Sequence, residues 1–161
     1  MLIAVFSDSH GALDAMRAAI EEHRPDMVLH LGDYVRDAEW LERKYSWMPL
    51  LYVRGNCDIG SDAPEFYILT LKGHKIFLCH GHRYGVKYDL LRIRYTAQEQ
   101  GAEICLFGHT HEAHNSLEND VLLVNPGPCS DCGLPSYAIL NLETGSADAE
   151  IRYIHQKLSR T

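Results

Sequence analysis

The sequence predicts an α/β fold in which parallel βαβ units come first and antiparallel strands follow. Two observations lead to this prediction. In the first third of the chain, short apolar runs of strand length alternate with segments that carry apolar residues at helical spacing. In the last third, apolar runs follow one another across short turns, which is typical of antiparallel pairs. The sequence contains no linker or low-complexity segment, so we expect one domain, 1–161.

The first 53 residues have the βαβ rhythm. The elements expected here are, in order, a strand from Leu2, a helix opened by Gly11 and closed by Pro25, a strand over 26–31, a helix over 36–45 stopped by Pro49, and a strand over 50–53. Strands that alternate with helices at this short spacing favour a parallel sheet.

The rest of the chain is richer in strands. The elements expected are a hairpin of 66–71 and 75–78, a helix over 88–100, a strand over 103–107, a strand pair of 114–117 and 121–124, and a closing pair of 137–142 and 149–154. On the helix over 88–100, we expect four residues to face the core: Leu90, Leu91, Tyr95 and Gln98.

Five of the expected strands end in residues that can bind a metal ion. The motifs are Asp8-Ser-His10, Gly32-Asp33, Gly55-Asn56, His80-Gly-His82 and Gly108-His109-Thr-His111. In α/β sheets, ligands bind outside the carboxyl ends of the strands. These side chains can therefore converge at one edge although they are spread over a hundred residues of sequence.

The residue types indicate two metal ions rather than one. Seven donors stand at these strand ends: Asp8, His10, Asp33, Asn56, His80, His109 and His111. Seven donors exceed what one ion needs, but they suit two ions that share a carboxylate about 3.5–4 Å apart, as in two-metal hydrolases. A mixture of nitrogen and oxygen donors without thiolate favours two divalent ions of Mn, Ni, Fe or Zn, and we expect Mn.

Each of these residues alone has a simpler explanation. A single Asp after a strand is usually a helix cap, and a single His is usually a surface or core residue. We interpret His23, His74 and His155 in this way, and we expect His30, on an apolar strand, to be a core histidine or to support a ligand. The seven donors differ because each stands at the same end of its strand.

In these motifs the chain resembles the calcineurin-like metallophosphoesterases, whose signature is D-x-H, G-D, G-N, a His in a G-H-rich turn, and G-H-x-H. All five occur here in that order, over residues 8–111. The Gly55-Asn-Cys-Asp58 variant and the later Val124-Asn-Pro-Gly127 are similar to the small bacterial and archaeal phosphodiesterase branch. The resemblance implies a four-layer α-β-β-α sandwich with two sheets packed face to face.

The resemblance also implies which residue holds which ion. The first ion would be bound by Asp8, His10, Asp33 and His111, and the second by Asp33, Asn56, His80 and His109. Asp33 would then bridge the two ions, and a hydroxide between them would attack phosphorus in line. We also count Asn56 among the catalytic residues.

One position departs from the family pattern. Many members have His where this chain has Cys57, and that His helps to protonate the leaving oxygen. A thiol is a poorer donor, so we predict modest activity that favours good leaving groups such as aryl phosphodiesters. Asp58 or His82 could act as the acid instead, and Asp58 could equally orient a ligand. Four residues beside the motifs could contact phosphate or form a solvated rim: Tyr34, Arg54, Arg83 and Tyr84.

The composition narrows the range of partners and locations. A formal net charge of −7 argues against general nucleic-acid binding, which depends on Lys and Arg. The apolar runs are too short to span a membrane, and no leader precedes Asp8, so we expect a cytoplasmic protein. Cys79 and Cys105 stand in apolar strands and should be buried thiols. Cys129 and Cys132 suit a place next to the site, or simply a loop, better than a zinc or redox pair.

We therefore predict a hydrolase of a small phosphorylated substrate, and we expect this substrate to be a phosphodiester. The alternative is a non-catalytic scaffold or interaction module of the same fold, as in the retromer branch of the family; a specialised monoesterase is a further option. Small soluble domains commonly form homodimers or homotetramers, and the sequence is compatible with either state.

Overall fold

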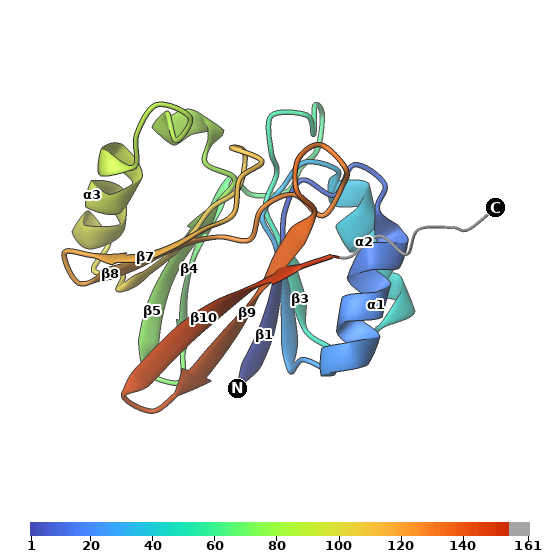
Figure 1. Cartoon of the computed structure of the whole chain (residues 1–161), viewed down its shortest axis with the longest axis horizontal. Coiled ribbons are helices and arrows are strands. Elements are labelled where there is room, and N and C mark those ends of the chain that lie inside the picture. The colour runs from blue at the N-terminus through green and yellow to red at the C-terminus, as the bar shows by residue number, and fades with distance from the viewer. Residues whose placement is uncertain (155–161) are drawn as a thin grey trace.

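Two five-stranded sheets pack face to face in the computed structural model, and helices cover their outer sides (Figure 1). The structure describes residues 1–154, so His155, interpreted above as a surface or core residue, lies outside the described part of the chain. The first sheet has the strand order β10-β9-β1-β2-β3 and the second the order β4-β5-β6-β8-β7. Each sheet contains parallel and antiparallel pairs. The predicted α/β class and the four-layer sandwich are confirmed.

The first sheet combines the two ends of the described chain. Its elements are β1 (Leu2–Phe6), α1 (Leu13–His23), β2 (Met27–His30), α2 (Val35–Lys44), β3 (Leu50–Tyr52), β9 (Ser136–Glu143) and β10 (Ser146–Tyr153). β1 lies parallel to β2 and antiparallel to β9. The parallel β1-β2-β3 unit predicted from the sequence is therefore extended by the closing hairpin.

The second sheet comes from the middle of the chain. Its elements are β4 (Phe66–Leu71), β5 (His74–Cys79), the 3-10 turn η1 (His82–Tyr84), α3 (Leu91–Glu99), β6 (Ile104–Leu106), β7 (His114–Glu118) and β8 (Val121–Asn125). β5, β6 and β8 run parallel, and the hairpin partners β4 and β7 form the two edges.

Three apolar layers hold the sandwich together. The central layer lies between the sheets and includes Val5, Leu29, Leu78 and Leu106. A second layer joins the first sheet to α1 and α2, and a third joins the second sheet to α3. Burial of apolar surface in these layers is the main favourable term for folding. None of the helices within 1–154 has the length and apolarity that a bilayer-spanning segment needs.

The predicted core face of α3 is wrong at three of its four positions. Leu91 and Tyr95 are more than half exposed, at 53% and 55%, and Gln98 is exposed as well. Ile93 and Ala97, one helical turn apart, instead point into the layer against the second sheet. Apolar residues occur on both faces of this short helix, so their spacing did not decide which face is buried.

Candidate metal centre

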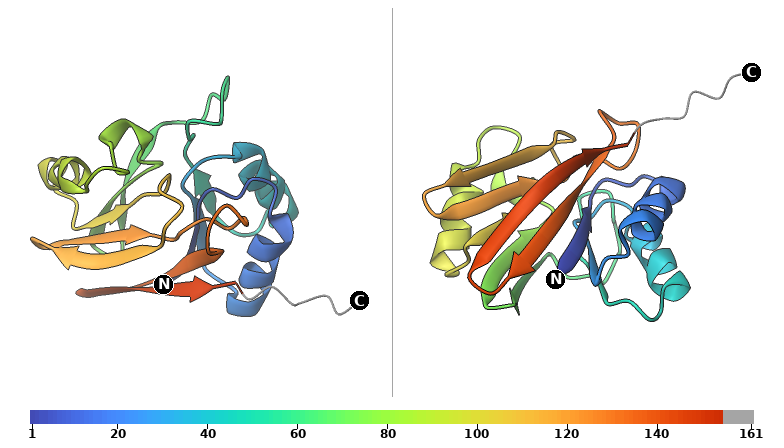
Figure 2. Two further views of the ribbon diagram at one scale, coloured as in Figure 1. Left: turned by 45° about the horizontal axis from the view of Figure 1, so that its top comes forward. Right: turned by 60° about the horizontal axis from the view of Figure 1, so that its bottom comes forward.

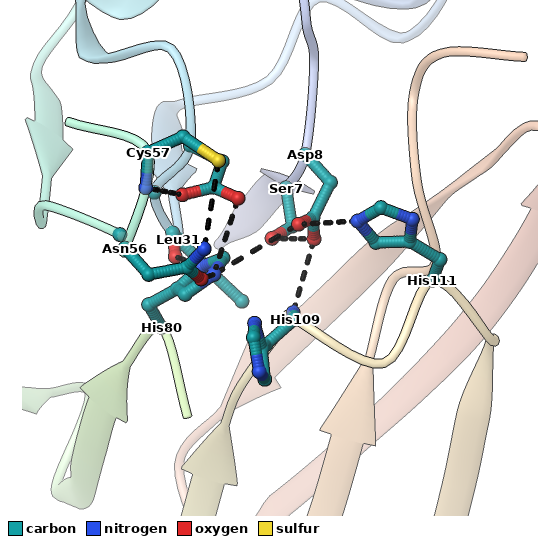
Figure 3. Close-up of polar contacts among 12 residues, drawn as sticks. Ser7, Asp8, Leu31, Asn56, Cys57, His80, His109 and His111 are labelled. Atoms are coloured by element: carbon teal, nitrogen blue, oxygen red, sulfur yellow. Dashed lines mark hydrogen bonds and ion pairs between the residues drawn. The ribbon is translucent and has the colours of Figure 1, made fainter. Parts of the chain in front are cut away.

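All seven predicted ligands lie at or just beyond the carboxyl ends of five strands, β1, β2, β3, β5 and β6. Three of these strands belong to the first sheet and two to the second, so the site lies where the ends of the two sheets meet. Figure 3 shows the carboxylate of Asp8 between His111 on one side and Asn56 and His80 on the other. The fold thus brings together residues as far apart in sequence as Asp8 and His111.

Four of the predicted ligands form a compact group. One ligand atom each from Asp8, His10, Asp33 and His111 lies within 4.8 Å of every other one. Nε2 of His111 is 3.1 Å from Oδ1 of Asp8, and Nε2 of His10 is 4.0 Å from Oδ2 of Asp33. These are the four residues that the family resemblance assigned to the first ion.

A second group forms around His80, which is buried at the end of β5. Its Nδ1 donates to the Leu31 carbonyl oxygen at 2.8 Å, which turns Nε2 toward the site. Nε2 then lies 3.1 Å from Oδ1 of Asn56 and 3.5 Å from Oδ2 of Asp33. The ring of His109 packs against that of His80, with ring centroids 5.1 Å apart.

Asp33 belongs to both groups. Its Oδ2 faces Nε2 of His10 and Nε2 of His80, and its Oδ1 accepts a hydrogen bond from the backbone N–H of Cys57 at 2.8 Å. Because that hydrogen bond fixes one carboxylate oxygen, the other stays directed between the two groups of donors.

The donor atoms suit divalent cations. Because the Leu31 carbonyl can only accept, His80 carries a proton on Nδ1, and in its neutral form the lone pair of Nε2 faces carboxylate and amide oxygens. A cation among these atoms would satisfy all of them. Nε2 of His10 is buried and has no hydrogen-bond partner among residues 1–154, although buried polar atoms are usually paired. The residues therefore fit bound metal.

The backbone is strained at most of these positions. Five of the seven predicted ligands have φ in the left-handed region: Asp8 (51°), His10 (42°), Asp33 (59°), His109 (70°) and His111 (60°). Non-glycine residues seldom adopt this conformation, and where they do, it tends to be at functional sites. The strain turns each side chain sharply off its strand and toward the others.

Two glycines make room for the carboxylates. A Cβ on Gly55 would collide with Oδ1 of Asp33, and a Cβ on Gly108 would collide with the Ser7 hydroxyl and lie 2.9 Å from Oδ2 of Asp8. Both glycines stand immediately before a predicted ligand. Their place in the motifs therefore follows from close approach between backbone and carboxylate.

Asp58 links the loops after β2 and β3. Its Oδ2 accepts hydrogen bonds from the backbone N–H of Asp33 at 2.9 Å and of Gly55 at 2.8 Å, and its Oδ1 accepts one from Val35 at 2.8 Å. Both carboxylate oxygens are thus held by backbone donors. This geometry favours the orienting role for Asp58 over that of a proton donor.

A buried chain of hydrogen bonds supports the Asp8–His10 loop from below, and sequence reasoning missed two of its members. The ring of His30 lies 3.1 Å from the Ser9 hydroxyl, and Ser9 donates to Asp37 at 2.8 Å. Asp37 also accepts the backbone N–H of Gly11 at 2.8 Å. His30 is fully buried and supports a ligand loop, which confirms the expectation for it. From the sequence alone, Asp37 is only an acidic residue in the first turn of a predicted helix.

Glu65 joins two other loops of the site, and no motif in the sequence pointed to it. Its Oε1 lies 2.6 Å from the guanidinium of Arg54, which precedes Gly55, and 2.6 Å from that of Arg83, which follows His82. Both arginines are therefore engaged with a carboxylate. Tyr84 packs edge-on against Phe77 in the layer below α3.

The pKa values of two acidic groups of the site, Asp8 and Cys57, are shifted in opposite directions. Burial raises the pKa of Asp8, but interactions with His111, His80 and Ser7 outweigh it and bring the pKa to about 2. Burial, together with the neighbouring Asp33 carboxylate, raises the pKa of the Cys57 thiol to about 11. Cys57 is thus a neutral thiol at neutral pH.

His82 lies next to the second group, and its Nδ1 is buried without a hydrogen-bond partner in the described part of the chain. Its ring centroid is 5.4 Å from that of His80 and 6.1 Å from that of His109. Burial, and then the charges of His80 and Arg83, lower its pKa.

The five cysteines are all free. Cys79 and Cys105 are buried in strands, as expected. Cys129 is buried and Cys132 is exposed, and both stand in the loop before β9. The structure thus shows no disulfide in this pair.

The family comparison agrees with the motifs. A model of the calcineurin-like phosphoesterase superfamily domain matches residues 1–145. This chain belongs to that superfamily. A probable metallophosphoesterase, YsnB, of Bacillus subtilis is 36% identical over 155 residues, covering 91% of this chain and 88% of that protein. A phosphodiesterase of Methanocaldococcus jannaschii is 28% identical over 162 residues, covering 89% and 94%.

Solved structures share the same fold. A protein of Streptococcus pneumoniae described as a predicted phosphoesterase superimposes with a TM-score of 0.70 at 28% identity, covering 94% of this chain and 97% of that one. Vps29 of Entamoeba histolytica, solved with Zn²⁺, superimposes with a TM-score of 0.77 at 20% identity, covering 95% and 99%. The second similarity is one of fold alone.

Proposed function

We propose that this protein is a metal-dependent phosphodiesterase with two divalent ions, Mn²⁺ being preferred over Ni²⁺, Fe²⁺ and Zn²⁺. The observation that carries the proposal is the position of Asp33, whose Oδ2 faces His10 at 4.0 Å and His80 at 3.5 Å. One carboxylate oxygen between two groups of donors is the arrangement that a bridging ligand needs. Membership of a phosphoesterase superfamily gives the reaction class.

The ligand assignment proposed here is the one that the resemblance implied. Asp8, His10, Asp33 and His111 would hold one ion, and Asp33, Asn56, His80 and His109 the other. When bound, the two ions supply a nucleophilic water of lowered pKa and positive charge that offsets charge on the phosphoryl oxygens.

The chain's own residues orient these donors. Leu31 fixes the ring of His80, the Cys57 N–H fixes one oxygen of Asp33, and Asp58 holds the backbone on both sides of the pair. Pre-set positions of this kind lower the barrier because the donors need not reorganise during the reaction. Catalysis would then depend on the two loops that Asp58 connects.

The acid that protonates the leaving oxygen is the weak part of the site. With a pKa of about 11, the Cys57 thiol gives up its proton reluctantly, and both oxygens of Asp58 are occupied by backbone donors. His82 is the remaining candidate, although its lowered pKa leaves little of it protonated at neutral pH. We therefore propose that the enzyme favours aryl and other good leaving groups.

The test uses protein stripped of metal. Adding Mn²⁺ or Ni²⁺ should restore hydrolysis of bis-p-nitrophenyl phosphate, and Asn56→Ala or His80→Ala should abolish it while the circular dichroism spectrum stays unchanged. A matched control is His114→Ala, because His114 lies on β7 and contacts Ser116. Wild-type rates in either ligand variant would show that the ligand assignment is wrong.

The alternative function, a non-catalytic interaction module, is favoured by one comparison. Vps29 of Schizosaccharomyces pombe is 28% identical over 142 residues, covering 84% of this chain and 75% of that protein. Absence of turnover with every divalent metal would favour the module. The cytoplasmic location, the single domain and a dimer or tetramer stay predictions.

A further inference from the structure

A groove of about 900 Å³ adjoins the proposed metal centre. Residues of α2, of the edge strands β3 and β4, and of the connecting segment 57–64 line it, and that segment projects from the body of the molecule (Figure 2). Tyr34 and Cys57 stand at the end of the groove nearest the centre. The ring of Tyr34 meets that of His10 at an angle of 65° with centroids 4.9 Å apart. A group attached to a phosphate at the centre can therefore extend into the groove.

The groove combines aromatic rings with negative charge. Three tyrosines line it: Tyr34, Tyr52 and Tyr67. Both oxygens of Asp58 are held by backbone donors. Among residues 1–154, the other carboxylates that line the groove are Glu39, Glu42 and Asp62, and the one cationic lining residue is Arg36. Tyrosine faces beside carboxylates attract organic cations and repel anions.

Two observations show that the aromatic and charged side chains of the groove interact with one another. The Arg36 guanidinium lies over the ring of Tyr34, 4.4 Å from its centroid, so this aromatic face already holds a cation. Burial raises the pKa of Tyr52, and the charges of Glu42 and Glu39 raise it further, which places both carboxylates within electrostatic reach of the tyrosine hydroxyl. Arg43 lowers this pKa by less than the two carboxylates raise it, so negative charge predominates around Tyr52.

We propose that this groove binds one substituent of the phosphodiester substrate and selects a substituent that carries a positive charge, such as a quaternary ammonium or an amine. The proposal rests on the proposed function, because it assumes that the phosphate lies at the metal centre. The same charges act against a substituent that carries a further phosphate. Substrates with a choline-like group should therefore be preferred over uncharged or polyphosphorylated ones.

A matched pair of substrates isolates the charge. p-Nitrophenyl phosphorylcholine and p-nitrophenyl 3,3-dimethylbutyl phosphate differ only in a nitrogen that replaces a carbon. In both, water adds to phosphorus and the bond to the aryl oxygen breaks, so the same p-nitrophenolate is released. We expect kcat/KM with Mn²⁺ to be about tenfold higher for the choline ester, the size of a cation–π contact combined with ion pairing.

Variants of the groove locate the effect. Glu39→Gln with Glu42→Gln should bring the ratio of the two kcat/KM values close to one by lowering the value for the choline ester. Glu99→Gln is the matched control, because Glu99 is an exposed carboxylate at the end of α3 in the other sheet's layer. This control should keep the wild-type ratio.

A binding measurement tests the proposal without requiring any hydrolysis. In the metal-free protein, choline should shift the amide NMR signals of segment 57–64 and of β3, and 3,3-dimethylbutan-1-ol should do so at least about tenfold more weakly. Equal kcat/KM values for the two esters, or equal shifts by the two alcohols, would overturn the proposal. If bis-p-nitrophenyl phosphate is not hydrolysed with any metal, the proposed function fails, and the choline shifts alone then decide whether the groove binds cations.

Discussion

Oδ2 of Asp33 lies 3.5 Å from Nε2 of His80, and this contact joins the two sheets. Asp33 follows β2 of the first sheet, and His80 follows β5 of the second. Neither sheet alone carries a complete site, so the packing between the sheets sets the separation of the donors. Interiors packed as densely as organic crystals hold such separations to a fraction of an ångström.

Replacing Asp58 tests whether it orients the loops. In Asp58→Asn, an amide NH₂ or a single carbonyl must face the three backbone donors that the carboxylate now satisfies. We expect a loss of about 1–3 kcal/mol in the free energy of unfolding, measured with urea, together with lower activity. Asp62→Asn, an exposed neighbour in the same segment, should leave stability unchanged. If Asp58 were only the acid, its replacement would alter the pH–rate profile and leave stability intact.

Gly55→Ala tests the close approach to Asp33. The added methyl group must displace the carboxylate, so we expect activity to fall about a hundredfold and Mn²⁺ to bind more weakly in isothermal titration calorimetry. Gly145→Ala provides the comparison: its φ is +84° and nothing lies within 4 Å of the new methyl. That variant should lose about 1 kcal/mol of stability while its Mn²⁺ affinity is unchanged. Equal Mn²⁺ affinity in Gly55→Ala and wild type would contradict the steric argument.

Cys57→His tests whether proton donation limits the enzyme. An imidazolium ion gives up its proton far more readily than a thiol with a pKa of about 11. We expect hydrolysis of diphenyl phosphate, which has the poorer leaving group, to gain at least about tenfold relative to bis-p-nitrophenyl phosphate, because a general acid contributes that much or more when the leaving oxygen needs a proton. Cys57→Ser should show no such gain. An unchanged ratio in Cys57→His would refute the explanation.

His74 predicts a pH dependence of stability that is independent of the metal site. Its ring bonds to the Glu143 carbonyl oxygen at 2.7 Å and to the Glu103 carboxylate, and in that order these contacts raise its pKa above the ordinary value. Because the folded pKa is the higher one, the contribution to stability is fully present below about pH 6.5 and is lost as the pH rises through the folded value.

The check is urea unfolding of wild type and His74→Gln between pH 5.5 and 9. The difference in free energy should be largest at pH 5.5 and should shrink toward pH 9. A difference that grows with pH would contradict the sign of the shift.

The alternation of strands and helices was enough to predict an α/β fold, and the strand-end pattern named the residues that converge, whereas the two-sheet sandwich was implied only by the family resemblance. Asp8, Asp33 and His80 each follow a short apolar strand, and parallel strands bring their carboxyl ends to one edge. The pairing of β1 with β9 was not predictable in the same way, because it joins the two ends of the chain and leaves no local periodicity.

Other features depend on tertiary contacts that sequence spacing does not encode. The burial of Ile93 rather than Leu91 follows from how α3 rotates against the second sheet. Glu65 carries no motif, and its role arises only because the loops with Arg54 and Arg83 come together in space. The hydrogen bonds between Asp58 and three backbone N–H groups likewise form only when the loops meet in the folded chain.

The number of Mn²⁺ ions bound per chain at saturation tests the central claim most directly. Equilibrium dialysis of metal-free protein should give two ions per chain in the wild type. In His80→Ala it should give one, because Asp8, His10, Asp33 and His111 remain together. A wild-type value of one ion per chain, or the same value in His80→Ala as in the wild type, would contradict a centre in which Asp33 bridges two ions.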